Sequence, residues 1–330
     1  MRQRGVPLRI AGGLCALLLV GTALFDVRQS SAEGTGEQEK LLLIAPAAPG
    51  GGWDALAREM QNGLREEELR FNVEVRNAEG AGGTIGLAQI VNRSGQSNVL
   101  SMTGLGMVGA VETTGSPYTM DDVTPIARLA SEYQVVVVPA DSPYETLDDL
   151  AQDWTAQETT LPVAGGSMGG VDQIFAGRVA QSMELAPGEI NYLPYSGGGE
   201  VLTSLLSGTA VVGFSSLSDF ADQVGGGGPL RVLAVSSPER LEGLDAPTFL
   251  EQGYEVEMSN WRGVIAPPGL TDTEVEVLEG LVAELVETPS WADTLERNRW
   301  TDTYQGRAEF TAFLEDEVAV TQETIEELGL

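Results

Sequence analysis

Residues 41–60 have the sequence LLLIAPAAPGGGWDALAREM, in which an apolar run leads through two prolines and three consecutive glycines into a helix-like segment. The apolar run predicts a buried strand, and the segment after the glycines predicts a helix. Glycine favours positions where the backbone must approach something closely. This strand–loop–helix unit therefore predicts an α/β fold and marks its loop as a candidate binding element.

Outward from this unit, short β-rich runs alternate with helical patterns along the chain. Such alternation indicates α/β units with largely parallel sheets, and the length of 330 residues is enough for two domains. The predicted strands are residues 41–45, 72–75, 98–102, 134–138, 161–164, 210–214, 230–235 and 262–266.

The N-terminus has the features of a leader. Three arginines precede the apolar run 10–25, and small residues at 30–32 offer a cleavage site, so we expect residues 1–32 to be a signal peptide. An uncleaved membrane anchor is the alternative. The polar residues 33–40 are then a linker.

Charge and residue inventory exclude several functions. Residues 1–32 hold four of the 18 basic and one of the 49 acidic residues, so the remainder keeps 14 and 48, a net charge of −34. This remainder has no histidine and no cysteine, and Lys40 is its only lysine. Nucleic acid is a poor partner for so acidic a chain. We expect no metal and no cofactor.

The pattern of this glycine loop recurs twice further along the chain. The stretch AGGSMGGVDQIF at 164–175 again follows a predicted strand and runs Gly-Gly-x-Asp into a helix, and PYSGGGEVLTSLL at 194–206 is a third version. Glycines before a helix N-terminus let an anion reach N–H groups that lack intrahelical partners. Ordinary strand–helix turns are the alternative for any single loop.

Two further motifs would indicate a serine hydrolase and a dinucleotide-binding site, but the rest of the sequence does not support either. Residues 165–169 match G-x-S-x-G, yet a nucleophilic serine needs a base and the chain has no histidine. Residues 104–109 match G-x-G-x-x-G, but this unit is not the first of the fold and a lone match is weak, so a ligand-facing loop of another kind is favoured over a dinucleotide site.

An ordered set of stretches resembles a known family, the substrate-binding proteins of tripartite tricarboxylate transporters, called TctC or Bug proteins. The matching stretches cover about residues 41–330 and are APAAPGGGWDALAREM, NAEGAGGTIGLAQI, TPIARLASEYQVVVVPADSPYETLDDL, VAGGSMGG, YLPYSGGGEVLTSLLSG and APTFLEQGYEVEMSNWRGVIAPPG.

The resemblance implies a type II periplasmic-binding-protein fold, in which two α/β lobes joined by two crossing segments close on a ligand. The crossings are expected near 134–139 and 259–264. Lobe one is then 41–136 with 262–330, and lobe two is 137–261.

The resemblance also implies a site that holds a carboxylate with backbone amides and water rather than arginine. Thr103, Ser167, Tyr195 and Ser215 are expected to add hydroxyl donors. Carried over residue by residue, the ligand-binding set is Gly50, Gly51, Gly52, Trp53, Asp54, Gly82, Gly83, Thr84, Thr103, Gly104, Gly166, Ser167, Met168, Tyr195, Ser196, Gly197, Ser215 and Ser216.

Three of these positions leave alternatives open. Trp53 replaces a small polar residue of the family and either narrows the pocket, stacks on a flat ligand or packs in the core. Asp54 either caps a helix or binds a ligand amine. Ser196 stands where the family often has lysine, which weakens any claim for a tricarboxylate.

The expected function is that of an exported, non-enzymatic receptor for a small carboxylate, which delivers its ligand to membrane transporter subunits. The receptor is expected to be a monomer and to be periplasmic or attached to the cell surface. A sensor subunit for a membrane signalling protein is the alternative, and a carboxylate-based lyase or hydrolase ranks third. Without histidine, the ligand affinity is expected to be nearly constant from about pH 6 to 8, unless a pocket acid such as Asp54 has a raised pKa or the ligand itself titrates in this range.

Overall fold

The computed structural model describes residues 40–330 apart from 158–160, 187, 189, 196 and 226. The predicted leader, most of the linker and Ser196 lie outside the described residues. Within the described ranges, every helix is too short or too polar to span a lipid bilayer.

Strands and helices alternate along the chain, as the sequence pattern predicts. The elements up to the long strand β4 are β1 (Leu41–Ala45), α2 (Gly52–Glu66), β2 (Val73–Asn77), η1 (Ala81–Gly83), α3 (Thr84–Val91), β3 (Val99–Gly104), α4 (Leu105–Thr114), η2 (Met120–Asp122) and β4 (Thr124–Pro139). The next elements are α5 (Leu147–Gln157), β5 (Pro162–Gly165), α6 (Val171–Ser182), β6 (Asn191–Pro194), α7 (Gly198–Leu206), β7 (Val212–Ser216), α8 (Leu217–Phe220), β8 (Leu230–Val235) and η5 (Leu250–Gln252). The chain ends with β9 (Ser259–Ala266), α9 (Asp272–Val286), α10 (Pro289–Asn298), β10 (Thr301–Gln305) and α11 (Arg307–Leu328).

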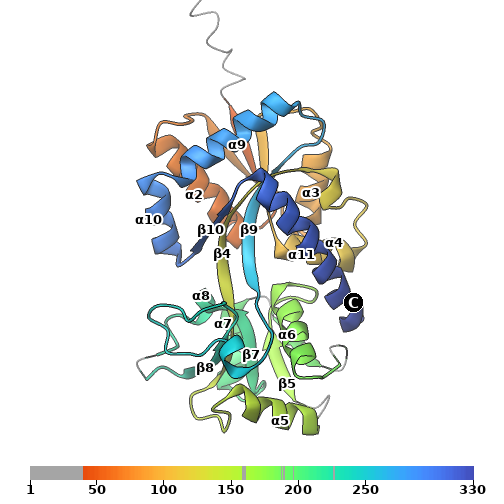
Figure 1. The fold of residues 1–330 in the computed structure, drawn as a ribbon, viewed down its shortest axis with the longest axis vertical. Coiled ribbons are helices and arrows are strands. Elements are labelled where there is room, and N and C mark those ends of the chain that lie inside the picture. The colour runs from red at the N-terminus through yellow and green to blue at the C-terminus, as the bar shows by residue number, and fades with distance from the viewer. Residues whose placement is uncertain (1–39, 158–160, 187, 189, 196, 226) are drawn as a thin grey trace, which may run out of the picture.

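The elements form two lobes, stacked along the long axis of the molecule and linked by β4 and β9 (Figure 1). We call lobe one the part built around β1, β2, β3, β9 and β10, and lobe two the part built around β5 to β8. The strand order is β2-β1-β3-β9-β4-β7-β5-β6, with β8 and β10 also beside β4. This is the two-lobed α/β architecture of type II periplasmic binding proteins.

Strand β4 changes partners where it leaves lobe one. Up to Tyr133 it pairs with β9, and from Gln134 it pairs with β7 and β8. All of these pairings are antiparallel, whereas β1–β2, β1–β3, β5–β6 and β5–β7 are parallel. The pairs β3–β9 and β10–β4 are antiparallel as well, so the expectation of largely parallel sheets holds only for the strand pairs that do not include β4 or β9.

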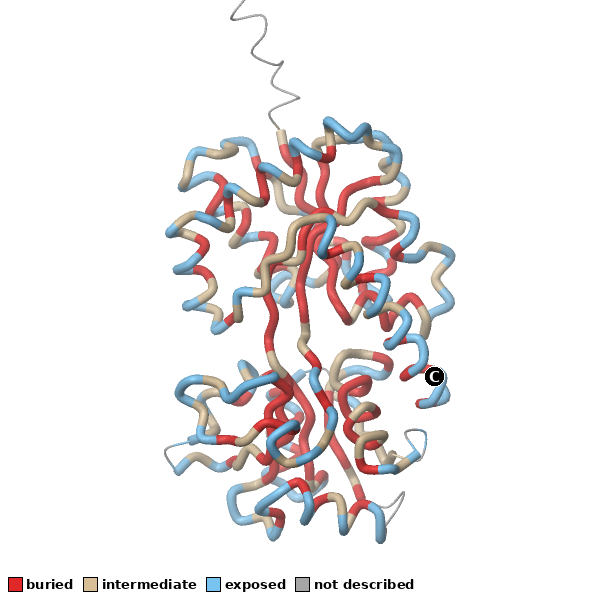
Figure 2. Tube along the Cα trace, viewed as in Figure 1, coloured by how far each residue is buried: buried red, intermediate tan, exposed pale blue. Residues whose placement is uncertain are grey.

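Burial explains why β1 is apolar at every position. Its side chains alternate between two hydrophobic clusters, with Leu42 and Ile44 in one and Leu41, Leu43 and Ala45 in the other. A strand that is covered on both faces gives a continuous hydrophobic run rather than an alternating one. Most of β4 and β9 is buried as well (Figure 2), although Tyr133 on β4 and Ser259 and Asn260 on β9 are only partly buried where the strands cross between the lobes.

The lobes also pack through helices. A Cβ atom added to Gly109 on α4 would lie 2.8 Å from Ile174 Cδ1 on α6 and 2.9 Å from the carbonyl oxygen of Gly169. Gly106, on the same helix, lies beside Val171 at the start of α6. The G-x-G-x-x-G glycines thus let a helix of lobe one approach lobe two closely, which gives this motif a packing role.

Candidate functional site

Asp54 shapes the first glycine loop. Its buried carboxylate accepts hydrogen bonds from Gly50 N, Arg58 Nε and Asn77 Nδ2, each at 2.8 Å. The hydrogen bond from Arg58 is the largest cause that lowers the pKa of Asp54 to about 2, against the opposing effect of burial. Asp54 is therefore ionised and occupied in holding the loop, and it does not cap α2, which was one of its two expected roles.

The loop leaves the N-terminus of α2 open. Gly51 is the N-cap residue, and no side chain caps the helix. The amide of Gly51 is occupied by the carbonyl oxygen of Ala48 at 3.0 Å, but the first N–H groups inside α2 have no intrahelical acceptors. These N–H groups, together with the positive end of the helix dipole, favour an anion at this position.

Trp53 brings the three predicted loops of lobe one together. A Cβ atom at Gly83 would lie 2.8 Å from Trp53 Cζ3, and one at Gly104 would lie 3.1 Å from Trp53 Nε1. Gly83 also has a φ of +99°, in the left-handed region that favours glycine. The indole ring is half-buried and packs against two hydrophobic clusters, one in lobe one and one that extends into lobe two, so it has the core-packing role that was one of its expected alternatives.

The threonine hydroxyls of lobe one turn inward. Thr103 is fully buried and its Oγ1 donates to the sulfur of Met107 at 3.5 Å, while Thr84 Oγ1 donates to the carbonyl oxygen of Ala81 at 2.9 Å. The structure therefore does not present Thr103 as a hydroxyl donor for a ligand. Alternate side chains of a strand point to opposite faces, so its place at the end of β3 did not reveal which face it occupies.

In lobe two, two acids meet at one serine. Asp172 Oδ2 accepts hydrogen bonds from Gly166 N at 2.8 Å and from Ser215 Oγ at 3.1 Å, and Ser215 Oγ also lies 2.6 Å from Asp219 Oδ2. One hydroxyl hydrogen cannot serve both carboxylates fully. Burial, and then the charge of Asp219, raise the pKa of Asp172 to about 7, while burial raises that of Asp219.

The repeated Gly-Gly-x-Asp sequence thus forms the same hydrogen bond, from a loop amide to the aspartate, in both lobes, but the pKa of the aspartate is shifted in opposite directions. Asp54 and Asp172 each accept an N–H from the glycine loop just before their helix. Asp54 has a guanidinium partner and a lowered pKa, whereas Asp172 faces a second carboxylate and has a raised one. The raised pKa that the sequence suggested for Asp54 is therefore found at Asp172, a residue outside the predicted ligand-binding set although the repeated Gly-Gly-x-Asp pattern includes it.

The other predicted residues of lobe two are divided between surface and interior. Ser167 and Met168 are exposed. Tyr195 Oη donates to Ser204 Oγ at 2.9 Å, so this hydroxyl is directed to α7 instead of a ligand. Gly197 is the N-cap of α7, and Ser216 Oγ accepts from Gln134 Nε2 at 2.8 Å.

An ion pair that the sequence analysis missed lies where the lobes meet. Arg262 Nη1 on β9 lies 2.7 Å from Glu132 Oε1 on β4, and both side chains are buried. Glu132 also accepts from Trp300 Nε1 of lobe one at 2.7 Å and from Ser218 Oγ of lobe two at 2.9 Å. Burial alone would raise the pKa of Glu132, but the charge and hydrogen bond of Arg262, together with the hydrogen bonds from Ser218 and Trp300, outweigh it and lower that pKa. No sequence signal reveals this pair, because its members are 130 positions apart.

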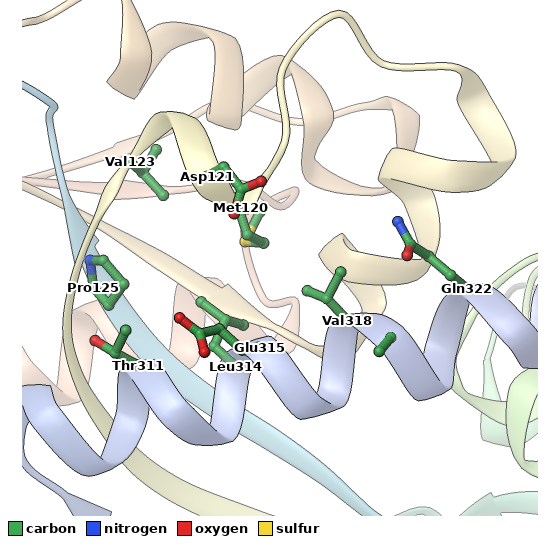
Figure 3. A pocket seen from close by; sticks show the side chains of 10 residues that line it. Met120, Asp121, Val123, Pro125, Thr311, Leu314, Glu315, Val318 and Gln322 are labelled. Atoms are coloured by element: carbon green, nitrogen blue, oxygen red, sulfur yellow. The ribbon is translucent and has the colours of Figure 1, made fainter.

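Two hollows on the surface lie away from these residues. One, of about 400 Å³, is bounded by Met120, Val123, Leu314 and Val318 between η2 and α11 (Figure 3). Another, of about 560 Å³, lies in lobe two beside Gly225, Gly227 and Gly228. Neither is lined by a predicted site residue.

Known proteins resemble this chain over most of its length. Residues 56–330 match the family described as the tripartite tricarboxylate transporter family receptor. Protein BugT of Bordetella pertussis is 26% identical over 87% of this chain and 88% of its own. A TctC solute binding protein from Polaromonas superposes with a TM-score of 0.75 at 26% identity, over 88% of this chain and 98% of its own. MatC from Rhodopseudomonas palustris, solved with bound malate, superposes with a TM-score of 0.71 at 20% identity, over 87% and 98%.

Proposed function

The chain belongs to the tripartite tricarboxylate transporter receptor family, and we propose from this that it is an extracytoplasmic solute receptor that binds a small carboxylate between its two lobes. Delivery to membrane transporter subunits, action as a monomer and the absence of catalysis are parts of the same proposal. The predicted leader at residues 1–32 agrees with an exported protein.

The uncapped N-terminus of α2 is the observation that carries the proposal. Asp54 fixes the preceding loop and is itself balanced by Arg58, so its charge does not cancel the positive end of the helix. Trp53 fixes the neighbouring loops around this helix end. An anion placed here is held by N–H groups that need no further rearrangement.

Lobe closure supplies the signal that a transporter can recognise. Glu132 accepts hydrogen bonds from Trp300 in lobe one and from Ser218 in lobe two, so the relative position of the lobes is coupled to buried polar contacts. A ligand that contacts both lobes shifts the population toward the closed arrangement by its differential affinity for it. The bound malate in MatC, which has the same fold, agrees with a carboxylate ligand.

Isothermal titration calorimetry with a panel of acids tests the proposal. The panel covers monocarboxylates from acetate to hexanoate and dicarboxylates from malonate to adipate, with malate and citrate added. We expect saturable one-to-one binding of at least one acid and none of its uncharged amide analogue. Equal heats from an acid and its amide would contradict a carboxylate receptor.

A further inference from the structure

Arg262 is buried but uses only part of its hydrogen-bonding capacity. Its side chain is 9% exposed, its Nη1 is paired with Glu132, and its guanidinium lies 5.0 Å from the centre of the Trp300 ring. A guanidinium carries five N–H donors in a rigid fork. Among the described residues, no group other than Glu132 accepts a hydrogen bond from Arg262. Its Nε–Nη2 edge is therefore without a protein acceptor there.

That free edge lies against the first residue of α2. A Cβ atom added to Gly52 would lie 3.1 Å from Arg262 Nη2 and 3.4 Å from Nε. Gly52 is also the position where the uncapped N–H groups of α2 begin. A fixed guanidinium edge and a helix N-terminus, each suited to an oxyanion, thus lie side by side on β9 and α2.

The lobe-two side of this junction is acidic. Asp172 and Asp219 share Ser215, and Glu132 and Arg262 both act on Asp219 through their charges. A second carboxylate directed toward these acids would be repelled, whereas a hydroxyl, an amide or an ammonium group would find acceptors. The charges thus divide the junction into an anion-binding side and an acidic side.

We propose that Arg262 binds the ligand directly, so that its Nε–Nη2 edge and the first amides of α2 hold one carboxylate while the far end of the ligand is uncharged or cationic. This inference rests on the proposed function and narrows it to monocarboxylates. In the family pattern given above, backbone amides and water hold the ligand carboxylate and no arginine takes part, so this chain would differ from that pattern. Glu132 orients the guanidinium and presents its free edge to Gly52.

The test uses three probes of equal length, titrated up to 50 mM: succinate, succinamate with one carboxylate and one amide, and uncharged succinamide. We expect wild-type protein to bind succinamate most tightly and succinamide most weakly. In Arg262→Met the affinity for succinamate should fall at least tenfold, to the level of succinamide. Succinamide affinity should stay unchanged, which a purely structural role for Arg262 would not produce.

Two further variants keep the test decisive if the lone Met substitution unfolds the protein by leaving Glu132 unpaired. The double variant Glu132→Gln with Arg262→Met removes both charges and should lose the preference for succinamate, whereas Glu132→Gln alone should keep it. Arg128→Met is the matched control, because Arg128 also lies on a strand that links the lobes and its guanidinium also lies over an aromatic ring, 4.2 Å from the centre of Phe313. It should bind succinamate within about threefold of wild type.

The outcomes separate the two claims. Full succinamate affinity in a folded Arg262→Met variant overturns the role of Arg262 and leaves the receptor function standing. If wild-type protein binds succinate more tightly than succinamate, the proposal that the far end of the ligand is uncharged or cationic is wrong. Failure of wild-type protein to bind any of the three probes up to 50 mM overturns this inference, whereas the carboxylate function is overturned only if no acid of the wider panel binds more tightly than its amide.

Discussion

Replacing Asp172 by Asn should change how stability depends on pH. The pKa of Asp172 is raised in the folded protein from 3.8 to about 7 by burial and by Asp219. Between about pH 4 and 7 the folded protein therefore keeps a proton that the unfolded chain has lost. The stability contributed by this group is fully present below about pH 4 and is lost as the pH rises through 7.

The structure sets the size of the effect. Each pH unit of pKa difference is worth about 1.4 kcal/mol, which gives an upper limit of about 4 kcal/mol for Asp172. The side chain is only partly buried, so we expect about 2 kcal/mol. Asn is neutral at every pH and can still accept the amide of Gly166. Asp172→Asn should therefore gain about 2 kcal/mol on wild type between pH 4 and 8, of which about 1 kcal/mol falls between pH 5 and 8.

Urea denaturation at pH 5, 6, 7 and 8 measures the difference directly. Asp219, Glu132 and Tyr192 influence Asp172, and Arg262 acts on Asp219. All four are retained in both proteins, so their own titration largely cancels. Asp54→Asn is the matched control at the echoed position. The pKa of Asp54 is lowered to about 2, so its contribution is present above about pH 4, and this variant should be less stable than wild type throughout the range. Parallel curves for Asp172→Asn and wild type from pH 5 to 8 would refute the reasoning.

Three other outcomes are expected. Gly51→Val should weaken carboxylate binding at least tenfold in calorimetry without unfolding the protein, because its side chain would crowd the open end of α2; unchanged affinity would remove this loop from the site. Ser167→Ala should weaken ligand binding by about 0.5–1.5 kcal/mol if this exposed hydroxyl reaches the ligand. A fluorophosphonate should not label Ser167 in wild-type protein, because labelling would indicate a nucleophilic serine. Gly109→Val should separate α4 from α6, where an added Cβ has only 2.8 Å to Ile174, and small-angle X-ray scattering should show a more extended molecule; an unchanged profile with unchanged stability would contradict this contact.

The local chemistry of the loops could be predicted from the sequence. An apolar run, glycines and an Asp two positions after the last glycine recur at Asp54 and Asp172, and both places form the same bond from the loop amide to the aspartate. That bond joins residues four or six positions apart, so the sequence contains both partners. The α/β class was predictable for the same reason, because periodicity over a few residues decides between strand and helix.

Only the tertiary structure decided which charges face each other. Asp172 meets Ser215 and Asp219 from β7 and the start of α8, while Arg262 meets Glu132 across 130 positions of chain. Periodicity reports that a position is buried but does not identify the residue that lies opposite. Since pKa values and ion recognition depend on distances between charges, the acidic side of the junction and the free edge of Arg262 emerge only when β4, β7 and β9 are brought together.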